Sequence, residues 1–311
     1  MSASYNARAY REYFENDFTY LNGFRRNLGR YGNRVAITDP DTGTRLTYAE
    51  LGERVDRVAT GLADAGVQAG DVVAYQLFNS VEFAELYLAT QAVGAVGSPI
   101  NFRLASGETS FILDKSAPTV FVYDTELTPM VTEALERSAH TPKVIVAVGD
   151  GDPVSVPGAT VVRYRHLAAD RVALPPLHRT VWDETTRLYT SGTTGMPKGV
   201  PLNSMIEIFS AHDVIMHFPL SPEDKTLNMT PWFHRGGLYS GGPTRSSTSA
   251  EKWCRCAPST RPRPRPRRRA RSHLPHRSAH QPRDARRRAG GPSARPVVAA
   301  RHRHDGCTAR T

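Results

Sequence analysis

The residues best suited to chemistry lie in one short segment, Tyr189–Val200, which reads YTSGTTGMPKGV. It holds three glycines, four hydroxyl side chains and one lysine: Gly192, Gly195, Gly199, Thr190, Ser191, Thr193, Thr194 and Lys198. Glycine lets a backbone turn tightly and approach a ligand closely. Successive backbone N–H groups in such a turn form a concavity that binds anions. Together with short hydroxyl donors and one point charge, this pattern predicts a polyphosphate site.

The residue order separates this segment from the Walker A phosphate loop. A Walker A motif ends in Gly-Lys-Ser/Thr, whereas here Pro197 precedes the lysine and Gly199 follows it. A Ser/Thr/Gly-rich surface loop without a ligand would have a similar composition. The length and order of the segment favour the ligand site.

A second candidate is His234, within Thr230–Leu238, which reads TPWFHRGGL. Taken alone, such a histidine is more typical of a packed, hydrogen-bonded side chain than of a catalytic one. The neighbouring Trp232 and Phe233 fit the wall of a pocket and a plain hydrophobic core equally well.

Hydrophobic periodicity and capping residues predict the elements that position these segments. Thr47 and Glu50 form a capping box that starts a helix, and Gly66 stands where its C-cap belongs. Further helices are expected at 80–93, 106–115, 129–138 and 203–217, and strands at 71–77, 95–100, 119–123, 143–148 and 186–189. Residues 149–180 are rich in Gly, Pro and polar side chains and are expected to form a connecting excursion.

Strands that alternate with helices predict an α/β fold, with a doubly wound, largely parallel sheet. The Thr190–Lys198 loop is expected between a strand and a helix. Three parts are expected along the chain: an N-terminal segment at 1–29, the α/β body at 30–244, and a basic tail at 245–311.

Four segments, in this order and spacing, resemble the adenylate-forming (AMP-binding) superfamily, and in particular its acyl-CoA synthetase and fatty-acid–CoA ligase type. They are Leu46–Leu51 (LTYAEL), Gly94–Leu104 (GAVGSPINFRL), Tyr189–Val200 and Thr230–Leu238. The resemblance covers most of residues 30–244, so it implies the N-terminal part of an adenylation domain.

The resemblance implies ATP-dependent, AMP-forming activation of a carboxylic acid, of the fatty or a related organic type. The acid would form an acyl-adenylate and then an acyl-CoA, with ATP, Mg²⁺ and coenzyme A as cofactors. The residues implied to hold the β- and γ-phosphates are Thr190, Ser191, Gly192, Thr193, Thr194, Gly195 and Lys198. Lys198 and His234 are implied as catalytic residues, with His234 beside the acyl pocket and the reacting carboxylate; no protein metal ligand is assigned.

The tail differs from the body in composition and charge. The whole chain has a net charge of +10, but residues 245–311 contain 19 Lys/Arg and 3 Asp/Glu, which leaves −6 for residues 1–244. All three cysteines, Cys254, Cys256 and Cys307, lie in this tail, so the body has no disulfide framework or thiolate metal site. The run Arg261–Arg269 (RPRPRPRRR) is of low complexity, and the tail is expected to be disordered.

A change of reading frame accounts for this tail. The superfamily's later segments, an adenine-contacting Y-G-x-T-E, a ribose-binding T-G-D aspartate and a C-terminal domain with a catalytic lysine, do not follow Gly242. When codons for Ala250–Arg261 are regrouped by one base, they permit EVVPLRAFDP, which resembles the superfamily at this point. We therefore expect a truncated and inactive fragment of an acid–CoA ligase.

Two other functions remain open on the residues alone. One is a non-catalytic nucleotide-binding or interaction protein, which the missing ribose aspartate and catalytic lysine favour over an active enzyme. The other is a basic-tailed nucleic-acid binder, against which the acidic body and the absence of a helix period, interleaved aromatic residues or zinc spacing argue.

The sequence also bears on location and partners. The first residues lack an apolar core of the kind a secretory signal needs, and no apolar run is long enough to span a bilayer. We therefore expect a cytoplasmic protein whose partner is a small carboxylic acid, with no membrane span and no specific nucleic acid. No pattern in the chain predicts its oligomeric state.

Overall fold

The computed structural model describes residues 6–40, 42–174, 176–191, 196–218, 220–239 and, for the backbone alone, 252–255. All of these belong to one compact unit, Met1–Thr260. The α-helices of this part are α1 (Ala7–Asp17), α2 (Tyr20–Tyr31), α3 (Tyr48–Asp64), α4 (Val81–Val93), α5 (Ser106–Ser116), α6 (Thr128–Arg137), α7 (Ser204–His217) and α8 (Arg235–Tyr239).

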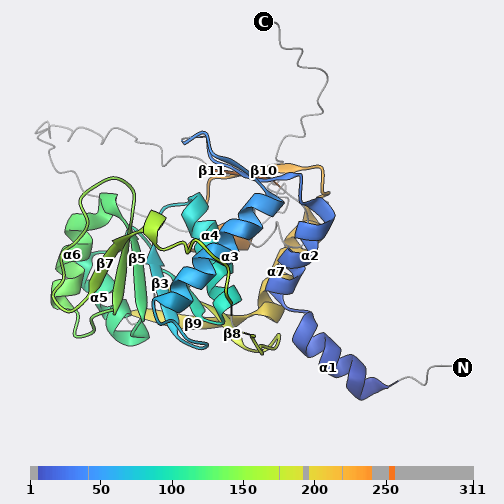
Figure 1. Cartoon of the computed structure of the whole chain (residues 1–311), viewed down its shortest axis with the longest axis horizontal. Helices are drawn as coiled ribbons and strands as arrows, with labels where there is room; N and C mark the ends of the chain where they lie inside the picture. Colours follow the sequence, from blue (N-terminus) through green and yellow to red (C-terminus); the bar gives the residue numbers. More distant parts are fainter. Residues whose placement is uncertain are drawn as a thin grey trace, which may run out of the picture. The chain divides into compact units, whose positions relative to one another are not determined.

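The strands form two sheets (Figure 1). The larger runs in the order β7-β6-β5-β3-β4-β8-β9, and the smaller in the order β10-β11-β1-β2. The larger sheet contains β3 (Val72–Gln76), β4 (Val96–Pro99), β5 (Val120–Asp124), β6 (Val144–Val148), β7 (Thr160–Arg163), β8 (Glu184–Ser191) and β9 (Pro197–Asn203). The smaller contains β1 (Val35–Thr38), β2 (Arg45–Thr47), β10 (Lys225–Asn228) and β11 (Lys252–Arg255).

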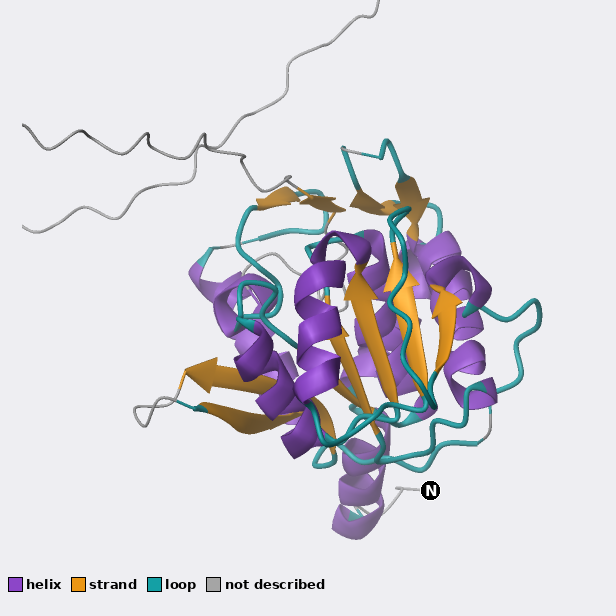
Figure 2. Cartoon of the chain, turned by 90° about the vertical axis from the view of Figure 1, so that its left-hand side faces the viewer, coloured by secondary structure: helices purple, strands orange, loops and turns teal. Residues whose placement is uncertain are grey.

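The larger sheet is doubly wound, as predicted. Every neighbouring pair from β7 to β8 is parallel, and only β9 runs antiparallel, against β8. Figure 2 shows helices on both sides of these strands. Successive side chains of one strand point to opposite faces, so Val73 and Tyr75 of β3 join the core cluster beneath α3 and α4, while Ala74 joins the cluster beneath α5 and α6.

The predicted caps are confirmed in their hydrogen bonds. The Thr47 hydroxyl accepts from Glu50 N (3.2 Å), and the Glu50 carboxylate accepts from Thr47 N (2.7 Å). Gly66, just beyond this helix, has a φ of +86°, which favours glycine. Ser80 Oγ accepts from Phe83 N at the start of α4 (3.1 Å), and Asn203 Oδ1 accepts from Ile206 N at the start of α7 (3.0 Å).

Three expectations about the elements differ from the structure. The phosphate-loop segment is followed by strand β9 and only then by helix α7, so the expected strand–loop–helix order was wrong. The 149–180 excursion contains β7, an edge strand that is only partly buried. The expected boundary at residue 30 falls inside α2, whose Phe24 is buried in the core.

The tail prediction lies almost wholly outside the described residues. Of residues 245–311 the structure describes only Lys252–Arg255, which form β11, parallel to both β1 and β10. The expectation of a tail without structure therefore does not hold for these four residues, and it stays a prediction for the rest. In the described ranges, no helix is both long and apolar enough to cross a bilayer.

Candidate active site

The predicted phosphate loop is the turn of a β-hairpin made by β8 and β9. Thr190 and Lys198 are Cα partners across this hairpin, and Ser191 pairs with Pro197. The structure therefore brings Thr190 and Lys198 together, and both are exposed. Gly192, Thr193, Thr194 and Gly195, as well as the side chain of Ser191, lie outside what the structure describes.

Lys198 is available to an anion. It takes part in no ion pair among the described residues, and its exposed side chain stands beside the turn that the glycines were predicted to form. By contrast, Arg187, farther down the same hairpin, is neutralised by Glu184 through two contacts of 2.7 and 2.6 Å. That carboxylate raises the pKa of Arg187 through its hydrogen bond. Lys198 thus carries the charge that an incoming polyphosphate would meet.

The hairpin is fixed to the parallel sheet through β4. Gly97 of β4 is the Cα partner of Thr186 in β8, and Ser98 Oγ donates to the Arg187 carbonyl (3.2 Å). Behind the hairpin, Glu207 of α7 is fully buried and accepts hydrogen bonds from Thr186 Oγ1 (2.7 Å) and from the Tyr87 hydroxyl (2.8 Å). No sequence pattern singled out Glu207. Its only signal was a lone carboxylate between Ile206 and Ile208.

His234 is held by a different set of contacts. Asn79, after β3, donates through Nδ2 to the Thr230 carbonyl (2.9 Å) and accepts at Oδ1 from Trp232 N (2.8 Å). His234 Nδ1 accepts from Gly236 N (3.1 Å), so the neutral ring carries its proton on Nε2. The histidine is exposed at the start of α8, and no hydrogen bond joins it to the hairpin in the described part of the chain.

The two aromatic residues before His234 have different environments. Trp232 is fully buried and meets Phe83 edge to face, with ring centroids 5.5 Å apart. Phe233 is half-buried and meets Phe102 edge to face at 5.2 Å, and Phe102 in turn lies 4.7 Å from Phe78. Trp232 is therefore a core residue, whereas Phe233 belongs to a partly open aromatic group beside His234.

Asn79 was not foreseen, and its role can be tested. Replacing Asn79 with Ala removes both hydrogen bonds to the His234 segment, of which the one from Trp232 N is part-buried and the one to the exposed Thr230 carbonyl can be replaced by water. We expect a loss of roughly 1–3 kcal/mol in the free energy of unfolding, with faster amide hydrogen exchange confined to residues 230–239. Denaturant titration and exchange mass spectrometry measure both, and Asn22→Ala in α2, whose Nδ2 bonds an exposed carbonyl, is the control. Exchange in 230–239 equal to wild type would contradict this role.

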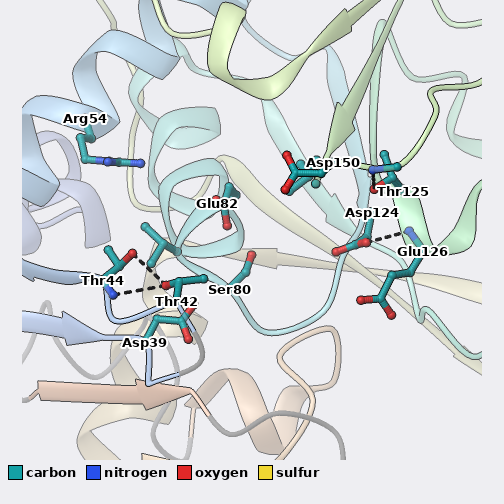
Figure 3. Close-up of a pocket in the computed structure, with 14 residues that line it drawn as sticks. Asp39, Thr42, Thr44, Arg54, Ser80, Glu82, Asp124, Thr125, Glu126 and Asp150 are labelled. Carbon is teal, nitrogen blue, oxygen red and sulfur yellow. Dashed lines mark hydrogen bonds between the residues drawn. The ribbon is translucent and has the colours of Figure 1, made fainter.

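A cavity of about 460 Å³ lies elsewhere, beyond the carboxyl ends of β5 and β6 and at the start of α4 (Figure 3). The carboxyl ends of parallel strands are where α/β folds commonly bind ligands. The charged side chains that line it are Asp39, Arg54, Glu82, Asp124, Glu126 and Asp150. Five carboxylates against one guanidinium repel a polyphosphate, so this cavity does not compete with the hairpin as the ATP site.

The comparisons with known proteins show the family of the chain. The family model described as "AMP-binding enzyme" matches residues 24–242. The chain belongs to this family. The match spans both the hairpin and the His234 segment.

Several of the similar curated proteins are named as CoA ligases or CoA synthases. The chain is 34% identical over 203 residues to the long-chain-fatty-acid–CoA ligase FadD13 of Mycobacterium tuberculosis, covering 65% of this chain and 38% of that protein. It is 33% identical over 197 residues to the feruloyl-CoA synthase of an Amycolatopsis species, covering 63% and 36%. The solved N-terminal domain of FACL13 from M. tuberculosis matches with a TM-score of 0.64 and 28% identity, over 76% of this chain and 57% of that one. The chain thus spans well under half the length of these curated relatives.

Proposed function

We propose that this chain carries the N-terminal, phosphate-binding part of an ATP-dependent, AMP-forming acid–CoA ligase. The observation that supports this most strongly is the pairing of Thr190 with Lys198 at the mouth of the hairpin, with the lysine ammonium free of any carboxylate among the described residues. A free cation beside hydroxyl donors fits the β- and γ-phosphates of ATP. The residues proposed to hold ATP are Thr190, Ser191, Gly192, Thr193, Thr194, Gly195 and Lys198.

In the proposed reaction a carboxylate attacks the α-phosphorus of ATP, giving an acyl-adenylate and pyrophosphate, and coenzyme A then accepts the acyl group. Mg²⁺ would neutralise phosphate charge alongside Lys198. Such displacements depend mostly on positioning and charge neutralisation. Lys198 would stabilise the departing pyrophosphate. His234, with its proton on Nε2, would present a donor toward the acid's carboxylate, next to the open aromatic group of Phe233 and Phe102.

The acid would be fatty or aromatic. FadD13 is named for long-chain fatty acids and the Amycolatopsis enzyme for ferulate, and the partly open Phe78, Phe102 and Phe233 group offers apolar surface beside His234.

We place the protein in the cytoplasm. Residues 245–311 do not carry the superfamily's ribose aspartate or catalytic lysine, so we propose that residues 1–311 on their own bind nucleotide with little or no turnover.

The test separates phosphate recognition from recognition of the whole nucleotide. Amide hydrogen exchange of residues 184–203 is followed in the full chain with Mg²⁺ and either ATP, inorganic tripolyphosphate or AMP. If the hairpin grips the β- and γ-phosphates, ATP and tripolyphosphate protect it at concentrations where AMP does not. Equal protection by AMP, or none by any of the three, would overturn the assignment. Protection without pyrophosphate release favours the non-catalytic alternative.

A further inference from the structure

Behind the phosphate hairpin lies a buried polar cluster centred on Glu207. Its Oε1 accepts from Thr186 Oγ1 and from the Tyr87 hydroxyl, which ties α7 to β8 and to α4. Its Oε2 is buried and has no hydrogen-bond partner among the described residues. The nearby Thr185 hydroxyl donates to the Leu202 carbonyl (3.3 Å), and its interaction with Glu207 favours the ionised form of the carboxyl.

The groups around this carboxyl are mostly hydroxyls, with one guanidinium, Arg235, acting on Tyr239. Those in electrostatic contact with it or with its tyrosine neighbours are Tyr20 of α2, Tyr75 of β3, Tyr87 of α4, and Tyr239 and Arg235 of α8. Tyr75 lies directly over the sheet here, because a Cβ built on Gly97 would stand 3.2 Å from its hydroxyl. Gly97 is the β4 partner of Thr186. No lysine, arginine or histidine forms an ion pair with Glu207 within the described ranges.

A carboxylate in this position is costly, because it would be ionised in a dry interior with one oxygen unpaired. When protonated, Oε1 still accepts from both hydroxyls, so the contacts of the hairpin are kept without a buried charge. When ionised, the group gains from any opening that admits water between α7 and β8. The charge of the Glu207 side chain is therefore coupled to how tightly α7 packs against the hairpin.

We propose that Glu207 is a positioning residue, whose protonated carboxyl holds the base of the phosphate hairpin against α4 and α7 and whose ionisation loosens that hairpin. The inference rests on the proposed function only in that the hairpin is taken to bind the phosphates of ATP. Burial raises the pKa of Glu207 to about 7, from an ordinary value of 4.5. The transition thus falls at physiological pH.

The sign of the effect follows from proton binding. Between about pH 4.5 and 7 the folded state keeps a proton that the unfolded state has lost, so stability from this group is full at low pH and falls as pH rises through 7. The Glu207→Gln variant keeps the hydrogen-bond acceptor but cannot ionise. The difference in stability between wild type and this variant therefore measures the contribution of Glu207 ionisation. Between pH 5 and 8 the unfolding constant of the wild type should rise by on the order of 70-fold relative to that of Glu207→Gln.

The hairpin itself supplies the second measurement. Hydrogen exchange of residues 184–203 in the full chain should lose protection, relative to Glu207→Gln, as pH rises from 6 to 8. Thr186→Val removes one of the two donors to Oε1, disfavours the ionised form and should move the inflection to higher pH, which a purely space-filling role would not do. Glu136→Gln, at an exposed position of α6, controls for loss of a carboxylate and should follow the wild type.

ATP affinity forms a separate arm. If the hairpin binds ATP, the affinity of the wild type for ATP should fall as pH rises through 7, and it should fall more than that of Glu207→Gln. The titration of ATP itself affects both proteins equally and cancels in this comparison. If ATP does not bind, the proposed function is wrong, but the stability and exchange measurements still test the role of Glu207. Identical pH profiles for wild type and Glu207→Gln would overturn the inference, and so would a shifted stability profile with unchanged hairpin exchange.

Discussion

Moving the sequence after residue 245 into the alternative reading frame should raise pyrophosphate release, with ATP, Mg²⁺ and a panel of fatty and aromatic acids, by a hundredfold or more. Without the ribose aspartate and the adenine contacts, ATP would be held by its phosphate end alone. Misplacement of a reacting group by about an ångström can cost on the order of a hundredfold in rate. Without the C-terminal lysine, developing charge goes unstabilised, and groups of this kind contribute roughly 3–4 kcal/mol each.

The measurement compares the chain as written with the frame-restored protein, at equal concentrations of folded protein judged by circular dichroism. A third variant, which ends after Gly242, distinguishes the absence of downstream parts from interference by the basic tail. Robust turnover by the chain as written would contradict both the frame hypothesis and the proposed lack of activity. Sequencing the gene across the Arg245 codon tests the frame directly.

Replacing Lys198 with Ala should lower acyl-adenylate formation in the frame-restored protein by roughly 10²–10³-fold, the usual effect of removing one group that stabilises developing charge. The lysine has no partner among the described residues, so its removal exposes no buried charge and should leave stability nearly unchanged. Lys198→Arg keeps the charge but changes its shape, and should retain part of the activity.

Lys143→Ala is the matched control, since Lys143 is also exposed but precedes β6, away from the hairpin. In the chain without frame restoration, binding of tripolyphosphate is measured instead. Lys198→Ala should bind tripolyphosphate more weakly than Lys143→Ala does. Equal pyrophosphate release by the two variants would show that Lys198 is an ordinary surface lysine.

Local hydrogen-bond chemistry made the helix boundaries predictable. Thr47 and Ser80 each cap a helix through a side-chain oxygen, as their position before an apolar stripe indicated, whereas Asn203, expected as the first helical residue, is the cap of α7. The fully buried strands were equally clear, because β3 is a continuous apolar run ending in Gln76. Six strands in the described part of the chain were missed: β7 and β9 at the edges of the larger sheet, and all four strands of the smaller sheet. β9 contains Pro197, Gly199 and Pro201, which argue against a central strand but are tolerated at an edge.

The parts of the candidate site that could be predicted are those with a distinctive residue pattern. The hairpin loop and His234 stand out through glycine, hydroxyl and family pattern. Asn79 and Glu207 do not, because their importance comes from partners 151 and 120 residues away in the chain, at Thr230 and Tyr87. A single buried glutamate in an apolar helix gives no sequence sign of which hydroxyls it will meet. The residues proposed to bind and react could be predicted from the sequence, whereas Asn79 and Glu207, which hold their segments in place, could not.

The strand order also bears on how the protein forms during translation. β3 to β7 come from the continuous stretch 72–163, and each new strand is added beside one already made. This part can assemble as it leaves the ribosome, before the hairpin is synthesised. The smaller sheet, by contrast, joins 35–38 to 225–228 and 252–255. β1 can pair early with β2 at 45–47, but its other edge stays open until β11 is made. The predicted change of frame after residue 245 would therefore alter a strand of that late-closing sheet and none of the strands β3 to β7.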